Sequence, residues 1–198
     1  MTIVQRDFDL ACSNWWAWRD VFEHRGRPTA SPLFEPRRFS RFLDEYNVRR
    51  TVREDGHEPL RELLLSPGFP LVDVLADCSG AALEQEEAKL RKFGSKDQSS
   101  VLSLFSKVAA FLAPDRFTAW DTYGRKGLNI VLGRAPTKVF SGYVAYLGEM
   151  NRLLATEIGA AVQGICAGRY PTSLASQGDG FHRRVLDICL MRLGGRFG

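Results

Sequence analysis

Apolar positions recur with helical spacing through most of the chain. Between Ser99 and Ala113 the apolar side chains are three or four residues apart, which places them on one face of a helix that Pro114 ends. The same spacing predicts further helices over 36–48, 58–65, 79–93, 122–132 and 179–195, and one bent helix or two short ones over 137–168. No hairpin dipeptide separates alternating runs, and 69–75 ("FPLVDVL") is a strand candidate. The pattern predicts an all-α fold.

Capping residues indicate where two of these helices begin. Ser79 suits the N-cap of the helix that Gly94 stops, and Asp121 or Thr122 suits the N-cap of the helix that Gly133 closes. A carboxylate at such a cap is fixed by backbone N–H groups and kept ionised by the positive end of the helix. Asp121 is therefore expected to be an ordered anion.

Composition fits one compact helical domain over residues 1–198, with two helical lobes and a cleft near 100–125 as the alternative. The chain has 198 residues, of which 44% are hydrophobic and 25% charged. No apolar run approaches the roughly 18 residues of a membrane helix, so no membrane partner is expected. The first residues lack the basic and apolar regions of a secretory signal. We expect a cytoplasmic monomer.

Metal and cofactor sites are not expected. The four cysteines stand far apart without a C-x-x-C pair, and the chain has three histidines, so buried thiols are favoured over disulfides or zinc ligands. Phosphate-binding glycine loops, H-E-x-x-H and G-x-S-x-G are absent from the sequence. The net charge is +4, and basic residues alternate with apolar ones in "EPRRFSRF", "NVRRTVR", "YGRKGL" and "FHRRVL". Such clusters suit a phosphate-lined surface as well as ordinary solvated helix faces.

Lys107 and Asp121 form a candidate reactive pair. Lys107 lies about 100° from the centre of the apolar face of its helix, at the edge where burial lowers the pKa of an amine and leaves it nucleophilic. The alternative is that its amine simply reaches water. The helix rises roughly 9 Å after Lys107, and an extended return from Pro114 to Asp121 spans more than that. Asp121 can therefore come back beside the amine, an arrangement that suits substitution at a centre gaining positive charge, such as a sugar C1′.

The segment that carries this pair resembles a known family. "SKVAAFL" followed by "PDRFTAWDT" is similar to the catalytic segment of the helix-hairpin-helix DNA glycosylases, particularly the bifunctional 8-oxoguanine type, and the resemblance covers about 25 residues of the chain. The resemblance implies that Lys107 is the nucleophile and Asp121 the carboxylate that assists it. Phe111, one turn after Lys107, corresponds to the residue that lies against the flipped base. A plain core position is its alternative role.

The resemblance also implies a substrate and a mechanism. The protein would flip an oxidised or modified purine out of double-stranded DNA, release it through attack of Lys107 on C1′, and cleave the strand from the resulting Schiff base. The other pocket candidates are Trp120, Phe181 and His182. Arg125 and Lys126 are candidate phosphate contacts, with solvent-facing charges as the alternative.

One part of the family pattern is replaced. Where the family has a glycine-rich hairpin before the lysine helix, this chain has "QSSVLSLFS", with no glycine between Gly94 and Gly124. The helix-hairpin-helix is thus degenerate. Two alternatives remain: a catalytically inactive helical module that binds DNA or protein, and an unrelated all-α protein in which Lys107 and Asp121 face different surfaces.

Overall fold

The protein is all-helical. The computed structural model describes residues 4–24, 27–96, 100–169 and 179–196, and within these ranges the chain forms helices and short 3₁₀ turns without a β-strand. The sequence-based prediction of an all-α fold is confirmed. No helix in these ranges is long and apolar enough to cross a bilayer.

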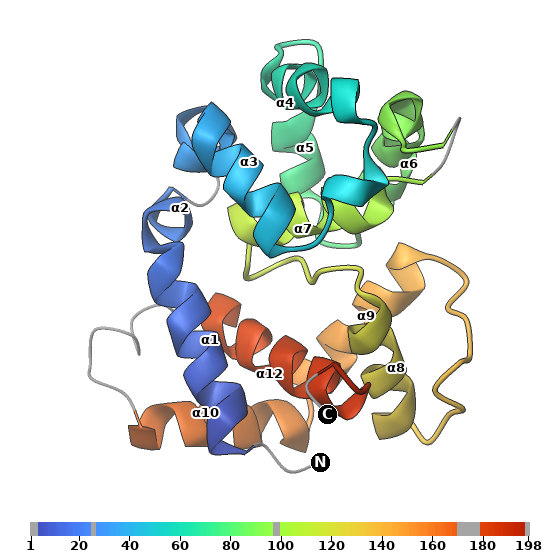
Figure 1. Cartoon of the computed structure of the whole chain (residues 1–198). Coiled ribbons are helices and arrows are strands. Elements are labelled where there is room, and N and C mark those ends of the chain that lie inside the picture. Colours follow the sequence, from blue (N-terminus) through green and yellow to red (C-terminus); the bar gives the residue numbers. More distant parts are fainter. Residues whose placement is uncertain (1–3, 25–26, 97–99, 170–178, 197–198) are drawn as a thin grey trace.

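The helices lie in two groups, which we call the upper and the lower lobe after their places in Figure 1. The upper lobe contains α2 (Arg19–Glu23), α3 (Pro36–Glu45), α4 (His57–Leu65), α5 (Leu71–Ala76), α6 (Ala81–Leu90) and α7 (Leu102–Leu112). The lower lobe contains α1 (Gln5–Ala17), α8 (Thr122–Val131), α9 (Tyr143–Leu154), α10 (Glu157–Arg169) and α12 (Asp179–Leu193). The 3₁₀ turns are Pro28–Ala30, Pro32–Phe34, Arg49–Thr51, Glu54–Gly56 and Arg91–Phe93. The lower lobe thus combines the first helix with the last ones.

Aromatic side chains from α2, α3 and α7 fill part of the upper core. Phe111 of α7 lies at the centre of this cluster, with its ring centroid 5.3 Å from that of Trp18 and 4.8 Å from that of Tyr46. Such edge-to-face contacts are favoured between rings. Because α7 is packed on several sides, nearly every residue along it is buried.

The lower lobe depends on close approach of α8 to α12. A Cβ added to Gly127 of α8 would lie 1.9 Å from the carbonyl oxygen of Leu190, so only glycine permits this packing. On its other side α12 packs against α1, where the Nε of Arg192 donates to the buried carboxylate of Asp7 at 2.8 Å. The ring centroid of Phe181 lies 5.4 Å from that of Trp15 in the same contact.

Two sequence-based expectations about secondary structure need correction or refinement. The strand candidate 69–75 is wrong, because helix α5 occupies most of that range and buries Leu71, Val74 and Leu75 on one face. Of the two alternatives for 137–168, the structure has two helices, α9 and α10, separated near Ala155.

The start of α6 also differs from the prediction. Its N-cap is Gly80, in the left-handed region at φ 80°, whereas Ser79 accepts a hydrogen bond from the backbone N–H of Ala81. The carboxylate of Asp77 accepts from the N–H of Ala82 at 2.8 Å, a contact that the sequence analysis missed. Burial raises the pKa of Asp77, but the hydrogen bonds that its carboxylate accepts from Ala82 and Ser79 outweigh burial and hold the pKa below its usual value.

The cysteines fit the expectation of buried thiols only in part. Cys166 and Cys189 are buried, and burial raises the pKa of each thiol to about 11. Cys12 is partly buried and Cys78 is exposed. All four are free.

Candidate active site

Lys107 is a buried amine at the boundary between the lobes. The residue is 5% exposed, and its Nζ donates a hydrogen bond to the carbonyl oxygen of Tyr46 at 3.0 Å. Tyr46 follows the end of α3, where carbonyls lack partners within the helix. The lysine therefore lies deeper than the edge position that its helical spacing predicts.

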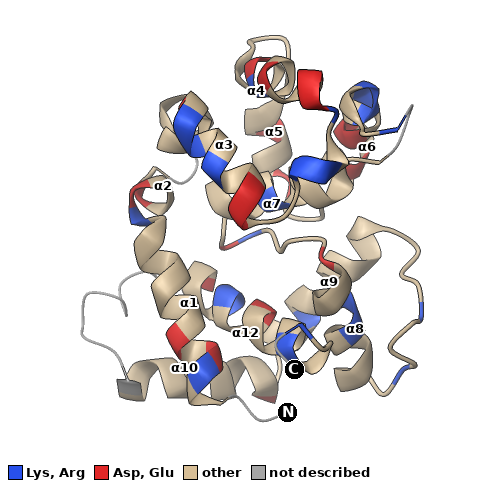
Figure 2. Cartoon of the chain, viewed as in Figure 1, with Lys and Arg blue, Asp and Glu red and all other residues tan. Residues whose placement is uncertain are grey.

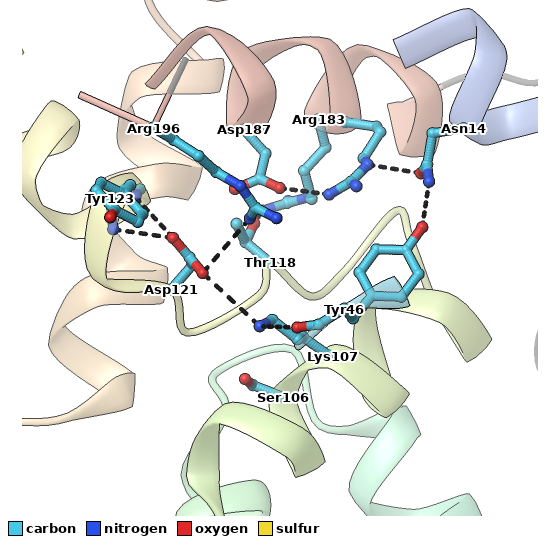
Figure 3. A network of polar contacts seen from close by, with 12 residues as sticks. Asn14, Tyr46, Ser106, Lys107, Thr118, Asp121, Tyr123, Arg183, Asp187 and Arg196 are labelled. Atoms are coloured by element: carbon cyan, nitrogen blue, oxygen red, sulfur yellow. Dashed lines mark hydrogen bonds and ion pairs between the residues drawn. The ribbon is translucent and has the colours of Figure 1, made fainter. Parts of the chain in front are cut away.

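Asp121 faces this amine. Its Oδ1 caps α8 by accepting from the N–H of Tyr123 at 2.8 Å and of Gly124 at 3.4 Å. Its Oδ2 lies 3.7 Å from Lys107 Nζ and 3.8 Å from Arg196 Nη1 (Figure 3). One oxygen is thus fixed by the helix while the other is directed at the amine. Of the two cap candidates, the structure has Asp121 rather than Thr122.

The segment from Ala113 to Asp121 is held in place by bonds from three helices. Ser106 of α7 accepts through its Oγ from the N–H of Trp120 at 2.8 Å. Tyr143 of α9 donates through its hydroxyl to the carbonyl of Thr118 at 2.7 Å, and Arg183 of α12 donates to the hydroxyl of Thr118 at 3.2 Å. The position of Asp121 relative to Lys107 is therefore set by the surrounding helices. The sequence analysis missed these three anchoring residues.

The environment of Lys107 favours a neutral amine. Burial is the largest influence and lowers its pKa from 10.5; the positive charges of Arg196 and Arg184 act in the same direction. The carboxylates of Asp121 and Asp187 oppose them, and the net effect is a lowered pKa. A larger fraction of neutral amine at neutral pH is what a lysine nucleophile requires.

A polar chain from α12 and α1 lies beside the pair. Arg184 donates to Asp187 Oδ2 at 2.6 Å and to Asn14 Oδ1 at 3.0 Å, and the Asn14 amide donates to the hydroxyl of Tyr46. Burial, with the nearby charge of Asp121, raises the pKa of Asp187. Its Oδ1 has no hydrogen-bond partner among the described residues. The spacing of Arg184 and Asp187 on one face of a helix was the available sequence signal for this missed pair.

Lys107 and Tyr46 line each of three neighbouring cavities. The first is walled by aromatic rings of the core: Trp15, Phe22, Phe111 and Phe117. The second lies between α1 and α12, with Asp121 at its edge, and is lined by Leu10, Asn14, Asp187, Ile188 and Met191 among others. The third, which we call the outer groove, has an empty volume of about 1010 Å³, part of it open to solvent. Lys107 is thus the point at which these spaces meet.

The predicted pocket residues separate into two groups. Phe111 lines the first cavity with Lys107, although it is 4% exposed and belongs to the upper core. Trp120, Phe181 and His182 line none of the three cavities. The ring of Trp120 packs against Tyr143 and Tyr146 instead.

Helix geometry explains the exclusion of Phe181 and His182. The residues of α12 that line the first cavity are Gly180, Arg183, Arg184 and Asp187, which have the spacing of one helical face. Phe181 points toward α1, where it packs on Phe8 and Trp15. Burial lowers the pKa of His182.

The two predicted phosphate contacts also have different surroundings. The Arg125 guanidinium lies 4.3 Å from the centre of the Trp120 ring, and burial lowers its pKa. Lys126 lines the outer groove together with Lys107 and Asp121. Lys126 therefore has a position that a phosphate can reach beside the reactive pair.

The coincidence of Lys107 and Asp121 in the sequence is matched by proximity in space. Their charged atoms are 3.7 Å apart, so the two residues do not face different surfaces. No protein-family model, curated protein or solved structure matches the chain.

Proposed function

We propose that the protein is a DNA glycosylase that releases an oxidised or modified purine, 8-oxoguanine or a relative of it, and has abasic-site lyase activity. The observation that carries the proposal is the buried amine of Lys107 beside a carboxylate fixed at a helix N-terminus. Both groups border cavities large enough to admit part of a nucleotide. The resemblance of "SKVAAFL" and "PDRFTAWDT" to the glycosylase segment assigns the same two residues to the same roles.

In the proposed reaction the neutral amine of Lys107 attacks C1′ of the damaged nucleotide. The bond from C1′ to the base breaks, and the base leaves with the bonding electrons and takes up a proton. Asp121 stabilises the positive charge that develops on the sugar and accepts a proton from the attacking nitrogen. Opening of the sugar ring gives a Schiff base, from which β-elimination expels the 3′ phosphate, and water then releases Lys107.

The cavity between α1 and α12 is the best supported place for the flipped base. It borders both Lys107 and Asp121, and its lining combines the apolar side chains of Leu10, Ile188 and Met191 with polar groups. A base needs this combination of stacking surface and hydrogen-bond partners. This proposal replaces the pocket that Trp120, Phe181 and His182 would have formed.

Covalent trapping tests the proposal. Sodium borohydride reduces the Schiff base, so wild-type protein should become linked to a duplex that carries 8-oxoguanine or an abasic site. Lys107→Gln should give no adduct, and Lys138→Gln, which alters an exposed lysine outside the cavities, should match the wild type. Peptide mapping should place the link on Lys107. An undiminished adduct in Lys107→Gln, or none with wild type on any lesion, refutes the assignment.

The alternative is a helical DNA-binding module without turnover. The hydrogen bond from Lys107 Nζ to the Tyr46 carbonyl favours it, because that bond gives the amine a purely structural role. Such a module binds damaged and intact duplexes equally and releases no base. Measurement of base release alongside affinity on matched duplexes separates the two functions.

A further inference from the structure

The outer groove collects cations from both lobes. Arg50 comes from the turn Arg49–Thr51 of the upper lobe, Lys126 from α8, and Arg196 from the turn that follows α12. Figure 2 shows basic residues on both lobes. They give the groove three cationic side chains besides the amine of Lys107, and Asp121 is the one carboxylate among its lining residues. The groove is therefore strongly biased toward an anionic ligand.

The arginines on either side of Arg50 pair with acidic side chains, whereas Arg50 does not pair with any among the described residues. Arg49 forms an ion pair with Asp44, and Arg53 forms one with Asp55 at 3.4 Å. Arg50 lies between them and forms no ion pair with a carboxylate of the described part of the chain, and the same holds for Lys126. Many other arginines of the described chain form ion pairs with nearby carboxylates. Both of these cations, Arg50 and Lys126, line the outer groove, which Lys107 lines as well.

Uncharged groups of the groove suit phosphate oxygens as well. Ser103 and Thr122 contribute hydroxyls, and the hydroxyl of Thr122 accepts a hydrogen bond from Arg125 at 3.3 Å, which leaves its own hydrogen to donate. Tyr123 presents a ring that is 40% exposed. Hydroxyls and cations around a trough are the usual partners of a nucleic-acid backbone.

We infer that the outer groove binds the phosphate backbone of DNA next to the nucleotide that Lys107 attacks, with Arg50 and Lys126 as direct phosphate contacts from opposite lobes. The assignment of the anion to DNA rests on the proposed function. It also accounts for anchoring without a glycine hairpin, because Ser103 belongs to the segment "QSSVLSLFS" that replaces it. In this proposal the cationic side chains of Arg50 and Lys126 bind the phosphates that backbone amides of a glycine-rich hairpin would otherwise bind.

Salt dependence of binding tests the inference. The affinity of wild type and of Arg50→Gln/Lys126→Gln for a lesion duplex is measured by fluorescence anisotropy between about 50 and about 200 mM KCl. Loss of two phosphate contacts should reduce the slope of log affinity against log salt by about 1.8. The matched control is Arg37→Gln/Lys138→Gln, which removes the same charge from two exposed residues outside the groove and should retain the wild-type slope.

The outcomes for the groove and for the chemistry are separable. A wild-type slope in Arg50→Gln/Lys126→Gln, or an equal loss in the control, overturns the groove assignment even when Lys107 gives a covalent adduct. A reduced slope in the groove variant alone supports it even when no adduct forms and the glycosylase proposal fails. Thermal unfolding of both double variants verifies that the fold is retained.

Discussion

The hydroxyl of Ser106 accepts a hydrogen bond from the backbone N–H of Trp120 at 2.8 Å, and these two residues are the direct neighbours of Lys107 and Asp121. Ser106 is fully buried. The bond ties the segment before α8 to helix α7 and so fixes the separation between the amine and the carboxylate.

Replacing this hydroxyl should affect both stability and chemistry. Ser106→Ala leaves the N–H of Trp120 without its partner, and we expect the free energy of unfolding to fall by about 1–3 kcal/mol. The rate of borohydride trapping should fall as well, because Asp121 loses its anchor. Ser13→Ala, on the exposed side of α1, is the control and should leave both unchanged. Urea denaturation and trapping kinetics measure the two effects; wild-type behaviour of Ser106→Ala in both contradicts the anchoring role.

The pKa of Lys107 should respond to its two charged neighbours in opposite directions. The Asp121 carboxylate raises this pKa and the Arg196 guanidinium lowers it. Asp121→Asn should therefore lower the pKa of Lys107 further, and Arg196→Gln should raise it. Competitive acetylation of the protein over a range of pH, read by mass spectrometry, reports the midpoint for Lys107. In wild type it should lie below 10.5, the ordinary value.

Identical midpoints in the wild type and both variants would show that these charges do not affect the pKa of Lys107.

The lowered pKa of Lys107 also affects how stability depends on pH. The unfolded state binds the proton more firmly than the folded state, so the contribution of Lys107 to the free energy of unfolding increases as pH rises from its folded pKa to 10.5.

Asp187 should show the opposite pH dependence. Burial raises the pKa of its carboxyl above 3.8 in the folded protein. Its contribution to the free energy of unfolding is therefore fully present below pH 3.8 and is lost as pH rises through the folded pKa. Asp187→Asn removes this titration while keeping an oxygen that accepts from Arg184. The stability of the variant relative to wild type should therefore increase as pH rises from about 4 through the folded pKa of Asp187.

Urea unfolding of both proteins across this range supplies the comparison. Taking the difference between the two cancels the other carboxyl groups, several of which, such as Asp77 and Glu149, have lowered pKa values. Parallel curves of stability against pH would mean that the Asp187 carboxyl titrates as it does in the unfolded chain.

Two glycines in neighbouring helices should respond oppositely to alanine. At Gly127 an added Cβ meets the backbone carbonyl of Leu190 at 1.9 Å, and helices α8 and α12 must separate to admit it. We expect Gly127→Ala to cost about 3 kcal/mol, because backbone atoms cannot rotate away. Gly148 of α9 has nothing within 4 Å of that position. Gly148→Ala should stabilise the protein by about 0.5–1 kcal/mol through helix propensity. Chemical denaturation of both variants gives the comparison.

The features that could be predicted from the sequence are the local ones. The apolar spacing of α7, the stop at Pro114 and the capping chemistry of Asp121 are all contained in a short stretch, and together they bring the carboxylate back to Lys107. The carbonyl of Tyr46 and the side chains of Asn14 and Asp187 could not be placed beside it. They come from helices far away in sequence, and their positions depend on packing.

The predictions that were wrong also failed because packing between distant segments decides the outcome. The segment that contains α5 has apolar residues at both strand and helix spacing, and burial of Leu71, Val74 and Leu75 against the rest of the upper lobe decides for the helix. Phe181 was predicted to line the pocket. The rotation of α12 about its axis depends on its packing against α1. In the observed orientation Phe181 packs on Trp15, and Arg183 and Asp187 line the first cavity instead.

The pairing of α1 with α12 has a consequence for the order of folding. The bond from Arg192 to Asp7 joins residues 185 positions apart, and closing so long a loop is slow compared with forming local helices. Residues 19–112 can therefore associate first, with Lys107 already on its helix. Asn14 and Asp187, which wall the cavity beside it, arrive together only when the two distant helices meet. A partly folded chain therefore has the Lys107 amine without the cavity that α1 and α12 form beside it.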